Sequence, residues 1–354
     1  MIDKVRVGLI GFGLGGRVFH APIIQSIDNF ELAKIVSTKK ETLEHVKAIY
    51  PQTEVITDAD LLFQDDLIDL IVVATPNTSH SEYVTKALLG NKHVVVEKPF
   101  TITAKEADDL IHLAQKQERV LAVHHNRRWD SDFLTVKRII ENNFLGNVVE
   151  YEAHFDRYRP EFKTNAWREE NLPGSGILYD LGSHLIDQAL CLFGLPMSVS
   201  GDVRIQRQGG KVDDYFEVIL DFGRTKAILK AGMLVRETLP HFIVMGEQGS
   251  FIKYGMDVQE AALKKGFIPK NCENWGMEPQ EQWGILNTEI HGIHFRGNVE
   301  SVQGDYREFY RNVYGAIRGT EELTVRPEEA RNVIRIIELA LESYKRRAIL
   351  PFTS

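Results

Sequence analysis

The sequence is poor in cysteine and has no surplus of basic residues. Its 354 residues include only two cysteines, Cys191 and Cys272, which are too few for a disulfide framework and lack the spacing of a metal site. This usage favours a reducing compartment, and we expect a cytoplasmic protein. The 42 basic and 50 acidic residues give a net charge of −8, which argues against a nucleic-acid partner because no basic surplus would meet the phosphates.

Long hydrophobic runs are also missing. No apolar run approaches the roughly 20 residues that span a bilayer, and the first residues lack the cleavage site of a signal peptide. We therefore expect no membrane partner. Hydrophobic residues make up 43% of the chain and charged residues 26%, as in ordinary globular proteins, and the length suggests two domains.

The first third of the chain alternates short apolar runs with amphipathic stretches. The runs are rich in Val, Ile and Leu and read KVRVGLIGFG, ELAKIVS, IDLIVVATP, KHVVVEKP and RVLAVHHN, as buried parallel strands do. Helical patterns lie between them, and one opens with Thr103 and Glu106 at the spacing of a capping box. This alternation predicts a doubly wound parallel sheet over residues 1–124.

Residues 125–354 follow a different pattern. A helical stretch, a strand and an apolar helix within residues 176–194 come first. Strand-like runs with short turns follow, and they read MSVSGDVRIQRQ, DYFEVILDFG, KAILKAGMLV and HFIVMGEQG. Strands joined in this way form antiparallel sheets, so we expect an α+β domain whose sheet leaves one face for a partner subunit.

A glycine motif follows the first predicted strand. Gly11, Gly13 and Gly16 form a GxGxxG that opens the next helix. Glycines at these positions permit a tight turn and let the backbone and the helix N-terminus approach a pyrophosphate. Glycine-rich turns without a ligand are common, but this place in a strand-helix alternation favours a dinucleotide.

The end of the second predicted strand indicates which dinucleotide binds. An NAD site normally has Asp or Glu there, whereas this sequence has Ser37, Thr38, Lys39 and Lys40. Hydroxyl groups beside ammonium groups suit a 2′-phosphate, so NADP is favoured and NAD stays possible. The alternative is that the two lysines only begin a solvated helix.

Two further segments end predicted strands at the same carboxyl edge, where ligands of doubly wound sheets bind. Thr75, Pro76 and Asn77 could border the nicotinamide ribose, and a plain turn that caps the next helix would explain the same residues. Glu97 and Lys98 end the strand of VVVEKPF. Opposite charges at a strand end are often only solvated, but a place beside the expected cofactor favours a function.

The segment HHNRRWD leaves the last strand of the first predicted domain. Asn126, Arg127 and Arg128 could meet a polar ligand there, and Trp129 could form a wall of its site. The alternative is a packing elbow between domains, with only one of the two arginines facing a ligand.

A polar line runs along the apolar helix. Asp180, His184 and Asp187 are four and three residues apart, so they share one side of a helix. A neutral histidine can take the proton of an alcohol near pH 7, so we expect His184 to be the base, with Asp180 orienting it. Lys98 would stabilise the developing alkoxide. Asp187 could touch the substrate or only end the polar line, and a lone Asp-x-x-x-His is more often a satisfied surface pair.

Together these motifs resemble the Gfo/Idh/MocA family of oxidoreductases. GFGLGG, VVVEKPF and GSGILYDLGSHLID occur in the family's order and spacing, and GDYREFYRNVYGAIRG resembles its C-terminal helix. The segments HHNRRWDSDFLTVKRII, DRYRPE and ILYDLGSHLIDQAL look closest to the NADP-dependent scyllo-inositol dehydrogenase branch.

The resemblance implies a Rossmann domain over residues 1–124 and an α+β domain over residues 125–354, whose large open-faced sheet forms homodimers or homotetramers. It implies NAD or NADP as the cofactor, no metal, and Lys98, Asp180 and His184 as the catalytic group. The residues expected on the substrate side are Arg127, Tyr158, Arg159, Trp167, Arg168, His184 and Asp187. The residues expected on the cofactor side are Gly11, Phe12, Gly13, Gly16, Ser37, Thr38, Lys39, Thr75, Pro76, Asn77, His80, Glu97, Lys98 and Asn126.

We therefore expect an NADP-dependent dehydrogenase that interconverts a cyclic polyol or sugar, of the inositol type, with its ketone. One alternative is the same chemistry on another sugar, a dihydrodiol or another carbonyl compound. Another is a non-catalytic NADP(H)-binding sensor, which could have lost the lysine, aspartate or histidine that this chain retains.

Overall fold

The computed structural model describes residues 4–163 and 167–353, which form two compact units. The first unit comprises the residues up to Asn126 together with Gln259–Trp275 and Asp305–Arg331. The second unit comprises Arg127–Val258, Gly276–Gly304 and the residues from Asn332 onward. The first break lies two residues after the predicted boundary, and two later segments join the first unit.

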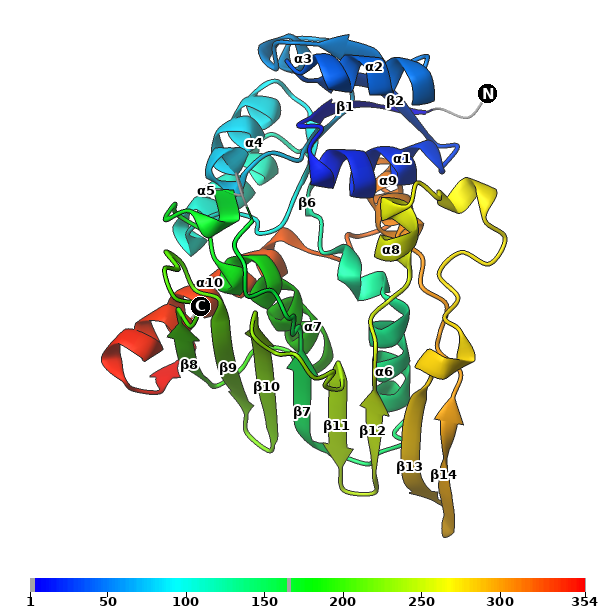
Figure 1. The fold of residues 1–354 in the computed structure, drawn as a ribbon. Coiled ribbons are helices and arrows are strands. Elements are labelled where there is room, and N and C mark those ends of the chain that lie inside the picture. Colours follow the sequence, from blue (N-terminus) through cyan, green and yellow to red (C-terminus); the bar gives the residue numbers. More distant parts are fainter. Residues whose placement is uncertain (1–3, 164–166, 354) are drawn as a thin grey trace. The chain divides into compact units, whose positions relative to one another are not determined.

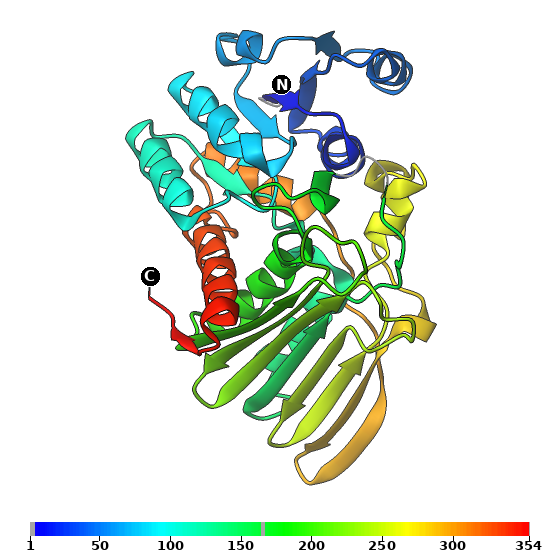
Figure 2. The same ribbon diagram turned by 60° about the vertical axis from the view of Figure 1, so that its left-hand side comes forward.

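The first unit is built on a six-stranded sheet with the order β3-β2-β1-β4-β5-β6, in which every pairing is parallel. The strands are β1 (Val5–Ile10), β2 (Phe30–Val36), β3 (Glu54–Ile56), β4 (Leu70–Val73), β5 (His93–Val96) and β6 (Leu121–Val123). All four side chains of β4 are fully buried, because helices cover both faces of the sheet (Figures 1 and 2). The predicted doubly wound Rossmann sheet is confirmed.

Helices connect these strands and end the unit. They are a π-helical segment η1 (Gly15–His20), α1 (Ala21–Gln25), α2 (Lys40–Ile49), α3 (Asp60–Phe63), the 3-10 turn η2 (Asn77–Ser79), α4 (His80–Leu89), α5 (Ala104–Lys116), α8 (Gln259–Lys264), η6 (Pro269–Asn271) and α9 (Arg307–Ile317). The predicted capping box is present: the Thr103 side chain accepts the Glu106 N–H, and the Glu106 carboxylate accepts the Thr103 N–H, each at 3.2 Å.

The second unit contains a nine-stranded sheet with the order β14-β13-β12-β11-β7-β10-β9-β8-β15, which spreads across the lower part of Figure 1. Its pairings are antiparallel except for the parallel pair of β7 and β10. The strands are β7 (Val148–His154), β8 (Ser198–Arg204), β9 (Tyr215–Phe222), β10 (Thr225–Gly232), β11 (Phe242–Gly246), β12 (Gly249–Lys253), β13 (Gly284–Ile290), β14 (Ile293–Val299) and β15 (Leu350–Pro351). The predicted α+β domain with a large, mainly antiparallel sheet is confirmed.

The helical elements after β6 are η3 (Asn126–Trp129), α6 (Ser131–Glu141), η4 (Trp167–Glu169), the π-helical segment η5 (Leu178–Gly182), α7 (Ser183–Phe193), η7 (Gln280–Gln282) and α10 (Pro327–Arg346). The division between the units falls at η3 and within α10. No helix among residues 4–163 and 167–353 combines the length and the apolar character needed to cross a bilayer.

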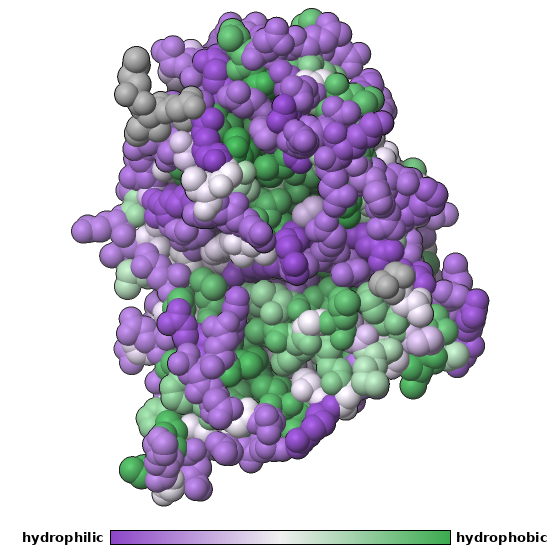
Figure 3. Space-filling view, turned by 180° about the vertical axis from the view of Figure 1, so that it is seen from behind, coloured by the Kyte–Doolittle hydropathy of each residue, from purple (hydrophilic) through white to green (hydrophobic). Residues whose placement is uncertain are grey.

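The two faces of the nine-stranded sheet differ. On the inner face, Tyr151 and Phe222 pack on the Phe193 ring of α7, with ring centroids 5.5 and 5.4 Å apart. The opposite face carries one row of paired side chains across the strands. Seven of them are half-buried, namely Ser200, Ile219, Ile228, Glu152, Ile243, Ile252 and Ile285, and the exposed Asn298 ends the row. Figure 3 shows hydrophobic residues gathered on one face of the part of the molecule that holds this sheet.

Candidate active site

The glycine loop of the first unit cannot carry side chains at two of its positions. Gly11 follows β1 with φ +94°, and a Cβ there would stand 2.5 Å from the Ala74 carbonyl oxygen. A Cβ at Gly16 would stand 2.1 Å from the Gly11 carbonyl oxygen. Gly13 is exposed and has no neighbouring atom within 4 Å of its Cβ position. The loop therefore makes a tight turn, and its backbone is open to solvent just before η1 begins. This arrangement fits a dinucleotide pyrophosphate.

The end of β2 offers hydroxyl and ammonium groups. Ser37 Oγ accepts the Lys39 N–H at 3.2 Å, and α2 begins directly afterwards at Lys40. Thr38 and Lys39 are exposed. Because no acidic side chain stands among these residues, a 2′-phosphate would meet positive charge rather than repulsion.

His80 joins the loops that follow β4 and β5. Its Nε2 lies 3.0 Å from the Thr75 carbonyl oxygen and its Nδ1 lies 3.0 Å from the Pro99 carbonyl oxygen. The imidazole is almost fully buried, and burial lowers its pKa. Its cofactor contact stays a prediction, while the geometry gives His80 a role in fixing the two loops. The predicted cofactor residue Asn77 is buried at the start of the same segment.

Glu97 and Lys98 directly follow β5. The Glu97 carboxylate accepts the Lys98 backbone N–H at 3.0 Å through Oε2, and its Oε1 lies 3.0 Å from His20 Nε2. Burial alone would raise the pKa of Glu97, but hydrogen bonds from His124 and His20 bring it well below its usual value. The strand end therefore holds an ionised carboxylate beside the predicted catalytic lysine.

In the second unit, the predicted catalytic helix begins with the π-helical segment η5, which contains Asp180. Its Oδ1 pairs with Arg168 Nε at 3.3 Å, and Arg168 lies over the Trp167 ring at 4.5 Å. His184 is 5% exposed and stacks on Phe155, with an interplanar angle of 26°. The structure thus brings the predicted substrate-side residue Arg168 to the predicted catalytic aspartate, with Trp167 packed against Arg168.

The two adjacent arginines of HHNRRWD have different partners. Arg128 forms a bidentate pair with Asp187 at 2.7 and 2.9 Å, and both side chains are buried. Arg127 pairs with Asp130 at 2.9 Å and lies over the Phe155 ring at 5.1 Å. A substrate contact of Asp187 stays a prediction, and the observed role of its carboxylate is to neutralise a buried arginine.

Tyr158 lies outside this group of contacts. Its hydroxyl accepts a hydrogen bond from Arg236 at 2.5 Å, and the Arg236 guanidinium lies over its ring at 4.1 Å. The side chain is 44% exposed, so it is available to a ligand.

Sequence reasoning overlooked three residues near the predicted site, two that touch Glu97 and one that touches the first of these. His20 and His124 lie against Glu97, and Tyr310 of α9 contacts His20. The ligand atoms of His20, Glu97 and His124 lie within 4.8 Å of one another, so these side chains have metal-ligand spacing. The apolar context of VFHAP was the only sequence signal for His20, and nothing linked Tyr310 to residues 290 positions earlier.

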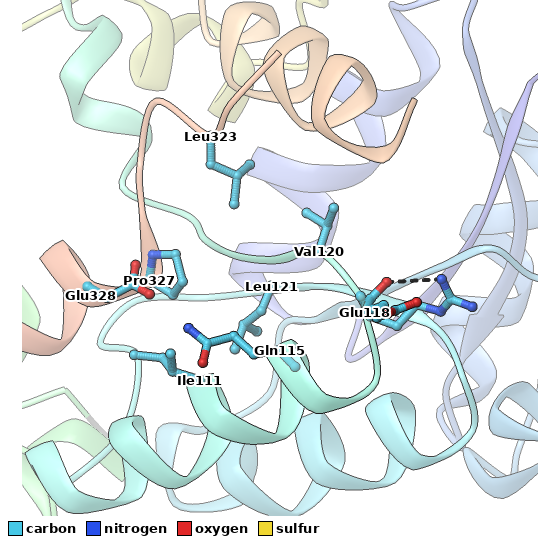
Figure 4. A pocket seen from close by; sticks show the side chains of 10 residues that line it. Ile111, Gln115, Glu118, Val120, Leu121, Leu323, Pro327 and Glu328 are labelled. Carbon is cyan, nitrogen blue, oxygen red and sulfur yellow. Dashed lines mark hydrogen bonds between the residues drawn. The ribbon is translucent and has the colours of Figure 1, made fainter. Parts of the chain in front are cut away.

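A pocket of about 320 Å³ lies elsewhere in the first unit, between the C-terminal end of α5 and the segment that leads into α10 (Figure 4). It is lined by Ile111, Ala114, Gln115, Glu118, Arg119, Val120, Leu121, Leu323, Pro327 and Glu328. None of the predicted site residues belongs to it.

The chain matches two family models that together cover most of its length. Residues 5–125 match the oxidoreductase family with an NAD-binding Rossmann fold, Gfo/Idh/MocA, and residues 137–351 match its C-terminal alpha/beta domain. The predicted nicotinamide cofactor, NADP or NAD, is thereby supported by the domain that binds it.

Full-length relatives agree with these matches. The chain is 40% identical over 346 residues to the scyllo-inositol 2-dehydrogenase (NADP(+)) IolW of Bacillus subtilis, with 98% of this chain and 95% of that protein covered. It is 44% identical over 352 residues to the uncharacterized oxidoreductase YdgJ of Escherichia coli, with 99% of each covered. The solved structure of the putative oxidoreductase yvaA from Bacillus subtilis superimposes with a TM-score of 0.95 at 40% identity, covering 100% of this chain and 99% of that one.

The glycine loop, the Glu-Lys-Pro strand end and the Asp-x-x-x-His helix thus occur on the fold that the family models describe. The chain belongs to the Gfo/Idh/MocA family of oxidoreductases and is an enzyme with an NAD(P)-binding Rossmann domain.

Proposed function

We propose that the enzyme is an NADP-dependent dehydrogenase of a cyclic polyol, of the inositol type, which it interconverts with the corresponding ketone. The full-length similarity to a scyllo-inositol 2-dehydrogenase that uses NADP(+) supports this substrate class. The observation that carries the proposal is the pair of Arg168 with Asp180, at 3.3 Å. It joins Arg168, a predicted substrate-side residue, to the predicted catalytic helix.

The strand end after β2 supports NADP over NAD. Ser37, Thr38 and Lys39 offer hydroxyl and ammonium groups and no carboxylate, so the extra phosphate gains attraction. The low cysteine content of two residues, Cys191 and Cys272, supports the cytoplasm as the proposed location.

Each catalytic side chain has a separate task in this proposal. His184 takes the hydroxyl proton of the alcohol, because a neutral imidazole is a suitable base near pH 7. Lys98 stabilises the negative charge that develops on the same oxygen. When bound, NADP⁺ would supply the acceptor for the hydride of the carbinol carbon, so that one alcohol and one NADP⁺ would give one ketone, one NADPH and one proton.

The test measures turnover of a panel of inositol isomers and open-chain polyols with NADP⁺ and with NAD⁺. Lys98→Met and His184→Ala should each lower kcat by about 100- to 10,000-fold, the usual contribution of a positioned acid-base group. NADPH binding, followed by fluorescence, should change little. Lys105→Met and His112→Ala make the same chemical changes at exposed positions of α5 and serve as controls.

Near-normal turnover in Lys98→Met or in His184→Ala would refute the assigned roles. Turnover of open-chain polyols alone would replace the cyclic substrate class. Tight NADPH binding without turnover of any compound would favour the alternative of a sensor.

A further inference from the structure

Three buried side chains surround the Glu97 carboxylate in the first unit, and together with it they form a cluster of four. His20 ends η1, His124 follows β6, and Tyr310 lies on α9. The side chains of His20 and His124 are 0% and 2% exposed, Tyr310 is 0% exposed, and the Glu97 side chain is 15% exposed. Because these residues come from four distant segments, the fold rather than local sequence assembles the cluster.

The polar atoms of this cluster form one connected chain. The Tyr310 hydroxyl lies 2.6 Å from His20 Nδ1, and His20 Nε2 lies 3.0 Å from Glu97 Oε1. The second carboxylate oxygen accepts the Lys98 backbone N–H at 3.0 Å. His124 Nδ1 approaches Oε1 from a third direction, at 3.4 Å.

Protonation fixes the direction of these hydrogen bonds. Hydrogen bonds from the histidines hold the pKa of Glu97 well below its usual value despite burial, so its carboxylate can only accept. His20 must therefore donate through Nε2. Burial raises the pKa of Tyr310 well above its usual value, so its hydroxyl keeps its proton and is able to donate to His20 Nδ1.

We propose that Tyr310 and His20 are positioning residues for Lys98: they hold the Glu97 carboxylate in place, and the carboxylate in turn fixes the backbone from which Lys98 departs. The inference rests on the catalytic role proposed for Lys98. For this task, neither Tyr310, His20 nor Glu97 needs to touch the substrate.

The same carboxylate also borders the glycine loop. A Cβ at Gly15 would stand 3.3 Å from Glu97 Oε1, so the loop passes close to this oxygen. The network therefore links two parts of the predicted cofactor-binding surface within the first unit, the glycine loop and the strand end after β5.

The spacing of His20, Glu97 and His124 would also suit a divalent metal, and this reading predicts a bound ion. The hydrogen-bond network predicts none, because both oxygens of Glu97 and both ring nitrogens of His20 have partners within the protein. Metal analysis of the purified enzyme separates the two readings.

The experiment compares Tyr310→Phe and Glu97→Gln with the wild type. Tyr310→Phe removes only the hydroxyl and keeps the ring that packs on Phe30 and Phe309, so the fold should persist. We expect kcat to fall about five- to tenfold, the value of one neutral hydrogen bond. Glu97→Gln should lower kcat about 100-fold, as for a misplaced catalytic group. Tyr83→Phe, at a ring that packs on Phe63, is the matched control and should keep the wild-type kcat.

The split between kinetic constants distinguishes positioning from loss of folding. In Tyr310→Phe, KM and the NADPH dissociation constant should stay within about twofold of the wild type, because Lys98 acts on the charge of the transition state. The ¹⁵N shifts of His20 should report the Nε2–H tautomer, and metal analysis should find no stoichiometric ion.

Wild-type kcat in Tyr310→Phe, or an equal loss in Tyr83→Phe, would overturn the proposal. A stoichiometric metal whose chelation abolishes turnover would overturn it as well. Should Tyr310→Phe fail to fold, Glu97→Gln decides by the same criteria. An inactive wild type would refute the proposed function instead, and an Nδ1–H tautomer of His20 would then still contradict the network.

Discussion

The buried pair of Arg128 and Asp187 gives a quantitative prediction. Its two hydrogen bonds measure 2.7 and 2.9 Å, and the side chains are only 7% and 2% exposed. Asp187→Asn keeps the shape of the side chain and removes its charge, so the guanidinium stays buried without its counter-ion. Breaking a buried pair from one side costs about 3–5 kcal/mol. For a domain of about 150–250 residues this lowers Tm by roughly 6–20 °C.

An exposed pair in the same unit provides the control. Arg204 and Asp202 form a similarly close bidentate pair, with hydrogen bonds of 2.6 to 2.9 Å, but their side chains are 54% and 31% exposed. Exposed pairs contribute about 0–1 kcal/mol, so Asp202→Asn should change Tm by only a few degrees. Both variants are compared with the wild type by urea unfolding and by thermal melting followed by circular dichroism.

A double variant tests the electrostatic reasoning itself. Replacing both partners, as Arg128→Met with Asp187→Leu, removes the stranded charge and should recover most of the loss of Asp187→Asn. Equal melting temperatures for Asp187→Asn and Asp202→Asn would contradict the reasoning. An unchanged Tm with a raised KM would instead identify Asp187 as the substrate contact suggested by its sequence position.

Two further predictions concern the glycine loop and the open face of the sheet. Gly11→Ala should lower both Tm and NADPH affinity, because Gly11 has a φ of +94° and its Cβ would stand 2.5 Å from the Ala74 carbonyl oxygen. Gly13→Ala should keep Tm and weaken only NADPH binding, because no atom lies within 4 Å of that Cβ position. Thermal melting and fluorescence titration measure the two effects, and an equal loss of Tm in both variants would contradict this reasoning. We also propose that the row of isoleucines on the open sheet face packs against a second copy of the chain. Ile228→Lys should then yield monomers in light scattering, whereas Leu67→Lys, at an exposed site of the first unit, should not. A monomeric wild type would refute this pairing.

Sequence patterns could predict the elements that have a regular burial pattern or a local capping signal. The run Leu70–Val73 is buried on both faces and reads as a parallel strand, and the capping box at Thr103 starts a helix as its spacing requires. β3 has only three residues and β14 exposes most of its side chains, so neither shows a clear hydrophobic period. These strands are held by their neighbours in the sheet, which a local pattern does not contain.

Some features of the candidate site could likewise be predicted from the sequence, and others could not. The backbone demands of Gly11 and Gly16 could be read from the motif, because they depend on local geometry. The partner of Asp187 could not be read, because Arg128 lies 59 residues away and both charges would suit an exposed helix equally well. The two π-helical segments, which begin the glycine-loop helix and the Asp180 helix, also follow no hydrophobic period.

Helix α9 packs in the first unit but lies late in the sequence, which affects how this unit folds during synthesis. The ring of Tyr310 is fully buried against Phe30 and His20, so the N-terminal sheet remains partly uncovered until the ribosome has added the residues beyond 305. At about 5–20 residues per second, the interval after Asn126 emerges lasts roughly 10–40 s. The nucleotide-binding unit therefore cannot complete its packing until the later residues have been synthesised. A fragment that stops at residue 126 should expose this apolar surface and aggregate.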